Sequence, residues 1–275
     1  MARFPVAIIT GATRGIGRAI VQELSSHGVC CVMIGSSMES LQSLEMAPPH
    51  FKHSQQWHRA ISIDLATWPR WTEMSGFPGF EITHVDGKVH QEPTLLSFHD
   101  YSFWRDKHNA QYDLKLLVNC AGVTQTTASI RTSTEKMQQL LNVNFMSAVS
   151  MCNMFSRRVI RTKKDLEGPA PCIVNISSIL GQHQGPIVAG TSIYSASKAA
   201  ILSYSKVLGV ELAPLGIRVE CICPGLVPGT DMIKQLDPDT QKKLQTNFEL
   251  RQPITSSNIA SRVWRIFNND NQNSI

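Results

Sequence analysis

The sequence predicts an α/β fold, a doubly wound parallel sheet of about six strands with helices on both faces. Two observations support this fold class. Short apolar runs alternate along the chain with segments of helical periodicity, which is typical of right-handed βαβ units. The apolar runs are nearly continuous, as expected of strands that are buried on both faces. We expect the strands at 5–10, 29–35, 60–64, 114–119, 172–177 and 217–223.

The segments between these strands predict the helices and one insertion. Long helices are expected at about 133–159 and 192–212, and a last helix at 259–267. Residues 67–113 are more than one crossover helix needs, and their aromatic content argues against a disordered linker. We expect one domain over 1–275, with this insertion as a small lobe packed on the body. A flap that contacts a partner or the substrate is the alternative. The polar end after the last helix predicts that no seventh strand follows.

The composition is that of an ordinary globular protein. The chain has 275 residues, of which 42% are hydrophobic and 17% charged, with a net charge of +5 and a pI near 8.9. No stripe of Arg and Lys is interleaved with aromatic residues, so we expect no nucleic-acid binding. No apolar run is long enough for a membrane span, and the first strand begins too early to leave room for a secretory signal. Seven cysteines without a C-x-x-C pair predict reduced thiols and no metal site.

A glycine-rich turn follows the first strand and predicts a phosphate site. It reads T-G-A-T-R-G-I-G, with Gly11, Gly15 and Gly17 around Thr13 and Ile16. Glycines let the backbone turn sharply and let a pyrophosphate approach closely, and the next helix presents free N–H groups to it. The position between a first strand and a periodic helix strengthens an otherwise weak signal. We therefore expect a Rossmann-type dinucleotide site here.

The end of the second strand favours NADPH over NADH as the cofactor. NAD sites usually carry an acidic residue at this point, which holds the ribose 2′-hydroxyl. This strand ends in Gly35, Ser36 and Ser37, and the nearest acid, Glu39, is expected in the next helix. Two hydroxyls and the guanidinium of Arg14 suit a 2′-phosphate instead. A solvated surface position is the alternative for Arg14.

Tyr194 and Lys198 form a Y-x-x-x-K pair. Residues four apart are neighbours on any helix, so such a pair can arise by chance. A free tyrosine has a pKa of about 10, and a fixed ammonium one turn away favours the phenolate and lowers that pKa. Next to a cofactor site, the pair can therefore serve as a proton donor and its electrostatic partner.

Five motifs, in order, resemble those of the short-chain dehydrogenase/reductase superfamily. T-G-A-T-R-G-I-G resembles its T-G-x-x-x-G-x-G motif, L-V-N-C-A-G its N-N-A-G motif and N-I-S-S-I-L-G its serine motif. Y-S-A-S-K resembles its Y-x-x-x-K motif, and P-G-L-V-P-G-T its P-G segment after the sixth strand. The order and spacing hold over about 5–235. Within the superfamily, the chain resembles the 3-oxoacyl-[acyl-carrier-protein] reductases, and most closely the fungal mitochondrial ones.

The resemblance implies four catalytic positions, which are Ser178, Tyr194, Lys198 and Asn144. Tyr194 would protonate the carbonyl oxygen, Lys198 would orient the nicotinamide ribose, and Ser178 would donate a hydrogen bond to the substrate oxygen. Asn144 would hold a water in a proton relay to Lys198. Ser177 is the alternative to Ser178, and Asn142 is the alternative to Asn144.

The resemblance also extends the set of predicted cofactor-binding residues. Asp64 and Leu65 would reach the adenine, and Val227 and Thr230 would meet the nicotinamide carboxamide. Cys120 stands where the family has a second asparagine, and a thiol donates hydrogen bonds poorly. The complete predicted set is Gly11, Thr13, Arg14, Gly15, Ile16, Gly17, Ser36, Ser37, Asp64, Leu65, Asn119, Ala121, Gly122, Tyr194, Lys198, Val227 and Thr230.

By resemblance, the expected activity is the NADPH-dependent reduction of 3-oxoacyl-[acyl-carrier-protein] to the 3-hydroxyacyl form in type II fatty acid synthesis. One alternative is a carbonyl or quinone reductase of small molecules, and another is an NADP-bound partner subunit without activity. The complete Ser178–Tyr194–Lys198 set argues against the inactive subunit.

The expected partners follow from the same resemblance. Acyl carrier protein is acidic, so its reductase needs basic residues near the mouth of the site. Arg131 and the run 157–164 are the candidates, and a solvated helix end is the alternative. Val210 stands where the bacterial enzymes often carry a docking arginine. We also expect a homo-oligomer, dimer or tetramer, in the mitochondrial matrix, with the cytoplasm as the alternative compartment.

Overall fold

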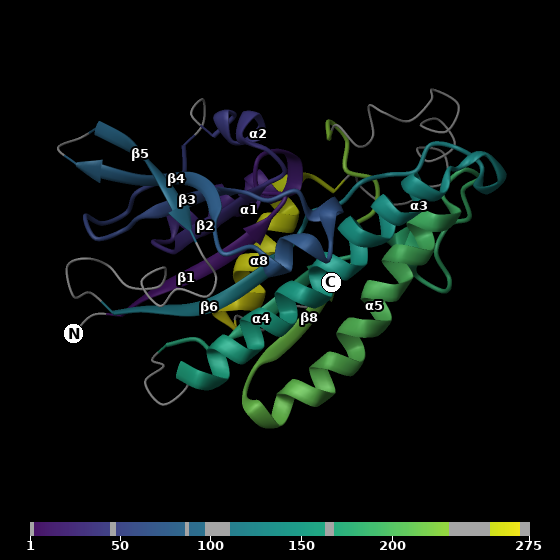
Figure 1. The fold of residues 1–275 in the computed structure, drawn as a ribbon. Helices are drawn as coiled ribbons and strands as arrows, with labels where there is room; N and C mark the ends of the chain where they lie inside the picture. The colour runs from purple at the N-terminus through teal and green to yellow at the C-terminus, as the bar shows by residue number, and fades with distance from the viewer. Residues whose placement is uncertain are drawn as a thin grey trace.

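The core of the molecule is a mostly parallel sheet with the strand order β5-β4-β3-β2-β1-β6-β7-β8 (Figure 1). It is seen in a computed structural model that describes residues 3–44, 48–85, 88–96, 111–162, 168–230 and 254–269. All six predicted strands are present. They are β1 (Arg3–Thr10), β2 (Cys30–Gly35), β3 (His58–Ser62), β6 (Gln111–Asn119), β7 (Cys172–Ile176) and β8 (Arg218–Ile222).

The expected count of about six strands is wrong, because the sheet has eight. The two further strands, β4 (Phe77–Val85) and β5 (Lys88–Leu96), come from the insertion. Strand β4 runs antiparallel to β3, with His58 opposite Ile82, and β5 runs antiparallel to β4. This part of the insertion therefore extends the sheet itself and does not form a separate lobe. Residues 97–110 of the insertion lie outside the described residues.

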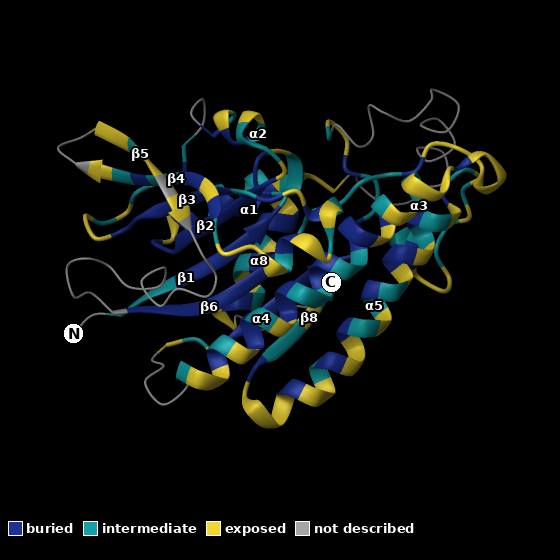
Figure 2. Ribbon diagram, viewed as in Figure 1, coloured by how far each residue is buried: buried dark blue, intermediate teal, exposed yellow. Residues whose placement is uncertain are grey.

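Helices cover both faces of the sheet. One face carries α1 (Gly15–Ser26) and α8 (Ser256–Asn268), which pack on each other and on the odd-numbered side chains of β1, such as Ala7 and Ile9. The other face carries α4 (Ser147–Thr162) and α5 (Ser192–Leu212), next to Val6 and Ile8 of β1. Figure 2 shows that β1, β2 and β6 are buried, whereas α4 and α5 present an exposed outer side. The doubly wound architecture is confirmed.

The predicted long helices are also present, with one irregularity. The segment expected as a helix at about 133–159 is α3 (Thr134–Leu141), a π-helical turn (Asn142–Met146) and then α4. Single π turns inside α-helices are frequent at functional sites. The remaining short helices are α2 (Met38–Gln42), η1 (Leu65–Thr67), η2 (Arg70–Glu73), η4 (Ser129–Arg131), η7 (Ile179–Gly181) and η8 (Ala213–Leu215).

The connectivity fixes where a ligand can bind. Strands β2 and β6 flank β1 on opposite sides, so the chain changes direction across the sheet between β1 and β6. In open α/β sheets, ligands bind at such a point, outside the carboxyl ends of the strands. Within the described ranges, no helix is long and apolar enough to cross a membrane. The prediction that no seventh strand follows the last helix falls on residues 270–275, outside the described residues.

Candidate active site

A cavity of about 710 Å³ lies at the carboxyl ends of the parallel strands. Its walls come from the β1–α1 turn, from the residues that follow β2, β3, β6, β7 and β8, and from the first turns of α5. Most of the predicted site residues line it. They are Gly11, Thr13, Arg14, Gly15, Ile16, Gly17, Ser36, Asp64, Leu65, Ala121, Gly122, Ser178, Tyr194, Lys198, Val227 and Thr230.

The glycine turn has the geometry that a pyrophosphate needs. Gly11 has a φ of +65°, and a Cβ atom added there would lie 2.8 Å from the Cα of Ala121. A Cβ atom on Gly17 would collide with the carbonyl oxygen of Gly11. Helix α1 begins at Gly15, its first turn holds no acidic residue, and Arg14 at the N-cap provides no side-chain acceptor. The first amides of α1 are therefore left for an anionic ligand.

Hydroxyl and guanidinium groups gather where β2 ends. Ser36, Ser40 and Ser43 line the cavity together with Arg14 and Arg18. Ser43 Oγ donates to the carbonyl oxygen of Thr13 at 3.0 Å, and Arg18 donates to the carbonyl oxygen of Ser43 at 2.8 Å. These contacts join the end of α2 to the glycine turn and to α1. Glu39 does not line the cavity, so the described wall here carries cations and hydroxyls without a carboxylate.

Ser37 was predicted to bind the cofactor, but the structure gives it another place. Its hydroxyl accepts a hydrogen bond from the Ser40 amide at 3.2 Å, and Ser40 Oγ accepts one from the Ser37 amide at 3.2 Å. This reciprocal capping box begins α2. Ser37 does not line the cavity, because its hydroxyl is used by the helix that it starts.

Asn119 is also displaced from the predicted role. It is buried behind the cavity wall, where its Nδ2 donates to Asn175 Oδ1 at 2.8 Å and so joins β6 to β7. Cys120 lines the cavity in its place. The amides of Cys120 and Ala121 both donate to Thr10 Oγ1 at 3.0 Å, so the backbone here is braced without a second asparagine. Burial raises the pKa of the Cys120 thiol to about 12, which keeps it neutral.

The two serines at the end of β7 have different environments. Ser177 Oγ donates to the carbonyl oxygen of Lys198 at 2.7 Å, a contact within the scaffold. Ser178 caps η7 by accepting from the Leu180 amide at 3.2 Å, and it hydrogen-bonds to Tyr194. Both serines line the cavity, but only Ser178 pairs with the tyrosine hydroxyl among the described contacts. This geometry favours Ser178 over Ser177 as the group that faces a reacting oxygen.

Tyr194 and Lys198 are buried in the wall of the cavity, with exposed fractions of 6% and 4%. The Lys198 Nζ lies 5.9 Å from the centroid of the Tyr194 ring and donates to the carbonyl oxygen of Ile176 at 2.9 Å. We expected the lysine to lower the pKa of the tyrosine, but that pKa is raised, because burial outweighs the lowering effect of the Ser178 hydrogen bond. Burial also lowers the pKa of Lys198.

Asn144 lies in the π-helical turn and holds the structure around the lysine. Its Oδ1 accepts from the Val123 amide at 2.9 Å, and its Nδ2 donates to Ser197 Oγ at 3.0 Å. It therefore contacts the neighbour of Lys198 and does not line the cavity. Asn142 points elsewhere, with Nδ2 donating to the carbonyl oxygen of Ala66 at 2.8 Å. Of the two asparagines, Asn144 is the one that joins α5.

Val227 and Thr230 close the cavity beside the glycine turn. Thr230 Oγ1 donates to the carbonyl oxygen of Val227 at 3.0 Å. A Cβ atom on Gly15 would lie 3.6 Å from Thr230 Cγ2, which shows how near this segment comes to the start of α1. Both predicted residues therefore line the cavity beside the glycine turn.

Gln125 is a buried residue that sequence reasoning missed. Its Oε1 accepts from the amides of Ile193 and Tyr194 at 2.8 and 3.2 Å. Its Nε2 donates to the carbonyl oxygen of Thr127 at 2.8 Å and to Thr132 Oγ1 at 3.1 Å. The side chain thus caps the first turn of α5 from a distant loop. The sequence around Gln125 gives no signal for this contact, because its partners lie 68 and 69 positions along the chain.

The described residues of the predicted basic patches do not line this cavity, and Lys163 and Lys164 lie outside the described residues. Arg131 is exposed at the end of η4, on a loop that adjoins the segment before α5, since a Cβ atom on Gly190 would lie 3.8 Å from the carbonyl carbon of Thr127. The described arginines of the run 157–164, Arg157, Arg158 and Arg161, line a second cavity. Lys136 and Gln139 of α3 line the first one and were not predicted.

Comparison with known proteins identifies relatives over most of the chain. The sequence model of the short chain dehydrogenase family matches residues 5–87 and 105–241. Carbonyl reductase family member 4 of Xenopus tropicalis is 39% identical over 239 residues, which cover 87% of this chain and 82% of that protein. The 3-oxoacyl-[acyl-carrier-protein] reductase FabG of Chlamydia trachomatis is 28% identical over 238 residues, which cover 86% of this chain and 79% of that protein. The crystal structure of a short chain dehydrogenase from Burkholderia cenocepacia in complex with NADP is similar in fold, with a TM-score of 0.65 at 23% identity over 95% of this chain and 89% of that one.

Proposed function

The chain belongs to the short chain dehydrogenase family, and we propose that it reduces 3-oxoacyl groups carried on acyl carrier protein, with NADPH as the cofactor. The observation that carries this proposal is the Ser178–Tyr194–Lys198 set in the wall of a cavity that also contains the glycine turn. Phosphate-binding backbone and a proton donor in one cavity are what a nicotinamide-dependent carbonyl reductase requires.

The residues present fit a dinucleotide cofactor. The glycine turn and the first amides of α1 would hold the pyrophosphate, and Asp64 with Leu65 would border the adenine. Ser36, Arg14 and Arg18 would surround a ribose 2′-phosphate, since the described wall there holds no carboxylate to bind a free 2′-hydroxyl. When bound, the reduced nicotinamide supplies a hydride to the carbonyl carbon.

The proposed chemistry of this chain is proton delivery to the carbonyl oxygen. Ser178 donates a hydrogen bond to that oxygen and so polarises the carbonyl group. Tyr194 gives its hydroxyl proton to the same oxygen as the carbon accepts the hydride, and the product is a secondary alcohol. The Lys198 ammonium, one turn along α5, stabilises the phenolate that forms and holds the cofactor ribose.

The substrate is proposed from the relatives together with one surface feature. Several relatives at 25% to 28% identity are 3-oxoacyl-[acyl-carrier-protein] reductases, including those of Bos taurus and Homo sapiens. Arg131, exposed on a loop beside the segment that leads into α5, can meet an acidic carrier protein. The second candidate is a reductase of small carbonyl compounds or quinones, and the 39% identity to carbonyl reductase family member 4 favours it.

The decisive experiment compares substrates on one enzyme preparation. NADPH oxidation would be followed with acetoacetyl-acyl carrier protein, acetoacetyl-coenzyme A, an ortho-quinone and a simple ketone. We expect the highest kcat/KM with the carrier-protein thioester. The Arg131→Glu variant should have a lower kcat/KM for this thioester than the natural chain. Turnover of the quinone alone would support the second candidate and overturn the first.

A further inference from the structure

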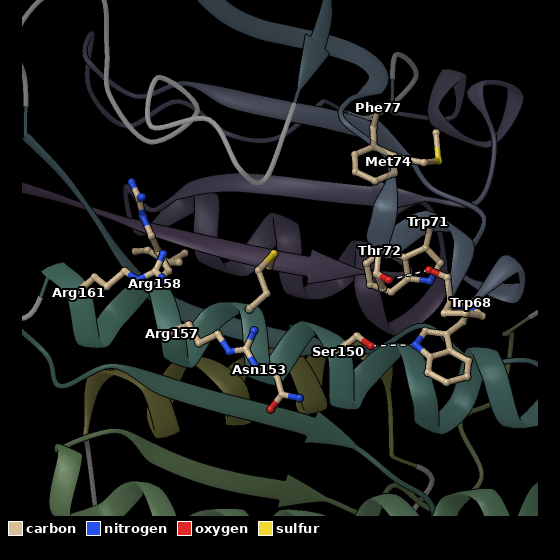
Figure 3. Close-up of a pocket in the computed structure, with 13 residues that line it drawn as sticks. Trp68, Trp71, Thr72, Met74, Phe77, Ser150, Asn153, Arg157, Arg158 and Arg161 are labelled. Carbon is tan, nitrogen blue, oxygen red and sulfur yellow. Dashed lines mark hydrogen bonds between the residues drawn. The ribbon is translucent and has the colours of Figure 1, made fainter.

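A second cavity, of about 500 Å³, lies between the insertion and helix α4. Its walls are η2 with the residues around it, the start of β6 and the outer part of α4 (Figure 3). None of the described residues that line it also lines the cofactor cavity. The volume falls within the range of pockets that hold small organic ligands. After β3 the chain forms only the short helices η1 and η2. The described part of the insertion therefore places no long helix against this side of α4, which leaves room for the cavity.

One part of this cavity is apolar and largely aromatic. It consists of Trp68, Trp71, Met74, Phe77, Leu114 and Met154. Trp71, Phe77 and Leu114 belong to the buried core beneath α4, so this wall is fixed by packing. Trp68 is held in place as well, because its Nε1 donates to Ser150 Oγ at 3.0 Å, as Figure 3 shows. A rigid wall of this kind suits the apolar body of a ligand.

The other part of the cavity is cationic. Arg157, Arg158 and Arg161 lie within the last two turns of α4, at the end of the cavity away from Trp68 (Figure 3). The described residues that line the cavity include no aspartate or glutamate. The nearby Asp113 is paired with Arg3 at 2.7 Å on the edge of the sheet. The helix dipole stabilises cations near the C-terminal end of a helix. That effect explains basic residues at this end of α4, but it does not explain why an apolar wall faces them.

One donor in the aromatic wall, the Trp71 indole N–H, is buried without an acceptor among the described residues. Trp71 is 4% exposed, and its Nε1 has no hydrogen-bond partner among the described residues. Leaving a buried N–H unsatisfied is unfavourable, so such groups in native proteins usually have an acceptor. This indole nitrogen is itself enclosed, so it takes no part in the binding proposed below.

We propose that this cavity binds a small amphipathic carboxylate, with its apolar body against the tryptophans and its carboxylate on Arg157 and Arg161 of α4. Guanidinium groups bind carboxylates with two parallel hydrogen bonds, and an apolar surround strengthens such pairs. The site is separate from the cofactor cavity, so ligand and NADPH bind together. This inference does not depend on which carbonyl compound the enzyme reduces.

The test is calorimetric titration of the full chain with decanoate, with and without saturating NADPH. We expect one saturable site per chain under both conditions. Decan-1-ol, which lacks the charge, and acetate, which lacks the apolar body, should each bind at least about tenfold more weakly. Competition between decanoate and NADPH would overturn the proposal, because the ligand would then occupy the cofactor cavity.

Paired variants separate this site from general attraction between charges. Arg157→Gln with Arg161→Gln should weaken decanoate binding by about tenfold or more. The matched control is Arg262→Gln with Arg265→Gln, which removes the same charge from the exposed side of α8 on the opposite face of the sheet. The control should bind decanoate as the natural chain does. NADPH affinity should be unchanged in both double variants, which would show that they are folded. Equal weakening by the two pairs, or none by the first, would overturn the proposal.

Discussion

Tyr194 is the residue on which the proposed chemistry depends most directly. Tyr194→Phe removes the proton donor and keeps the ring, so we expect kcat to fall by about 100-fold or more while NADPH still binds. Tyr204→Phe is the matched control, because it deletes a hydroxyl on the same helix outside the cavity. Steady-state kinetics and cofactor titration of both variants test this expectation. A Tyr194→Phe protein with full activity would contradict the mechanism.

The pH dependence of reduction follows from the burial of the same hydroxyl. Burial raises the pKa of Tyr194, so the proton-donating form persists at neutral pH, and kcat should fall only as pH rises through that raised pKa. The Ser178 hydrogen bond lowers the pKa, so Ser178→Ala should move the alkaline fall to higher pH as well as reduce kcat. Profiles of kcat against pH for both proteins measure the shift. A shift to lower pH would show that Ser178 does not stabilise the phenolate.

Cofactor choice also depends on a single side chain. Ser36→Asp places a carboxylate at the end of β2, where it repels a 2′-phosphate and accepts from a 2′-hydroxyl, so the preference for NADPH over NADH should fall at least about tenfold. Ser37→Asp is the control, since it adds the same charge at the N-cap of α2 without lining the cavity. Dissociation constants for both cofactors decide the question. If Ser36→Asp and Ser37→Asp changed the cofactor preference equally, Ser36 would not be the residue that determines it.

The site residues differ in how far a motif can locate them. Motif spacing placed Ser178, Tyr194 and Lys198 in the cavity wall, because such motifs fix backbone position and helix phase. It did not fix which way a side chain turns, and Asn119 faces Asn175 in the core instead of the cavity. Gln125 was assigned no role from the sequence, and its contacts exist because a loop folds back over the start of α5.

At the scale of elements, α5 is the helix that carries the chemistry, and Gln125 fixes its start. Gln125→Met removes the acceptor for the Ile193 and Tyr194 amides, so we expect a loss of about 1–3 kcal/mol in the free energy of unfolding. Displacement of Tyr194 should also lower kcat more than it raises KM. Thr126→Val, an exposed change on the same loop, should alter neither quantity. Denaturant unfolding and kinetics supply both readouts, and unchanged values for Gln125→Met would contradict this role.

The strands differ in how well the sequence predicts them. Five of the six parallel strands are mostly buried and contain apolar runs, and all six were found at the expected places. The sixth, β8, is less buried because it lies at an edge of the described sheet. The β4–β5 hairpin lacks such runs, because β5 is an edge strand and both strands carry a proline, Pro78 and Pro93. Its place in the sheet depends on pairing with β3, a tertiary contact that local patterns do not encode.

At the scale of the whole molecule, two cavities with different linings lie at different places around the sheet. The carboxyl ends of its strands hold the cofactor cavity, and the insertion and the outer part of α4 enclose the second cavity. The segment Leu65–Trp68 lies between them, since Leu65 lines the first cavity and Trp68 the second. Asn142 ties this segment to the π-helical turn through the carbonyl oxygens of Ala66 and Trp68. One short segment therefore forms part of both walls.

The outer sides of α4 and α5 predict self-association. Ile160, Val207 and Val210 are 42%, 57% and 76% exposed there, and apolar side chains gathered on one face commonly mark an interface. We expect a homo-oligomer of the 30.5 kDa chain, for which a dimer through these two helices suffices. Val207→Glu with Val210→Glu should dissociate it in sedimentation equilibrium, because burial of two carboxylates opposes pairing. Ile187→Glu, an exposed change in the loop before α5, is the control and should leave the mass unchanged. A monomeric natural chain would contradict the prediction.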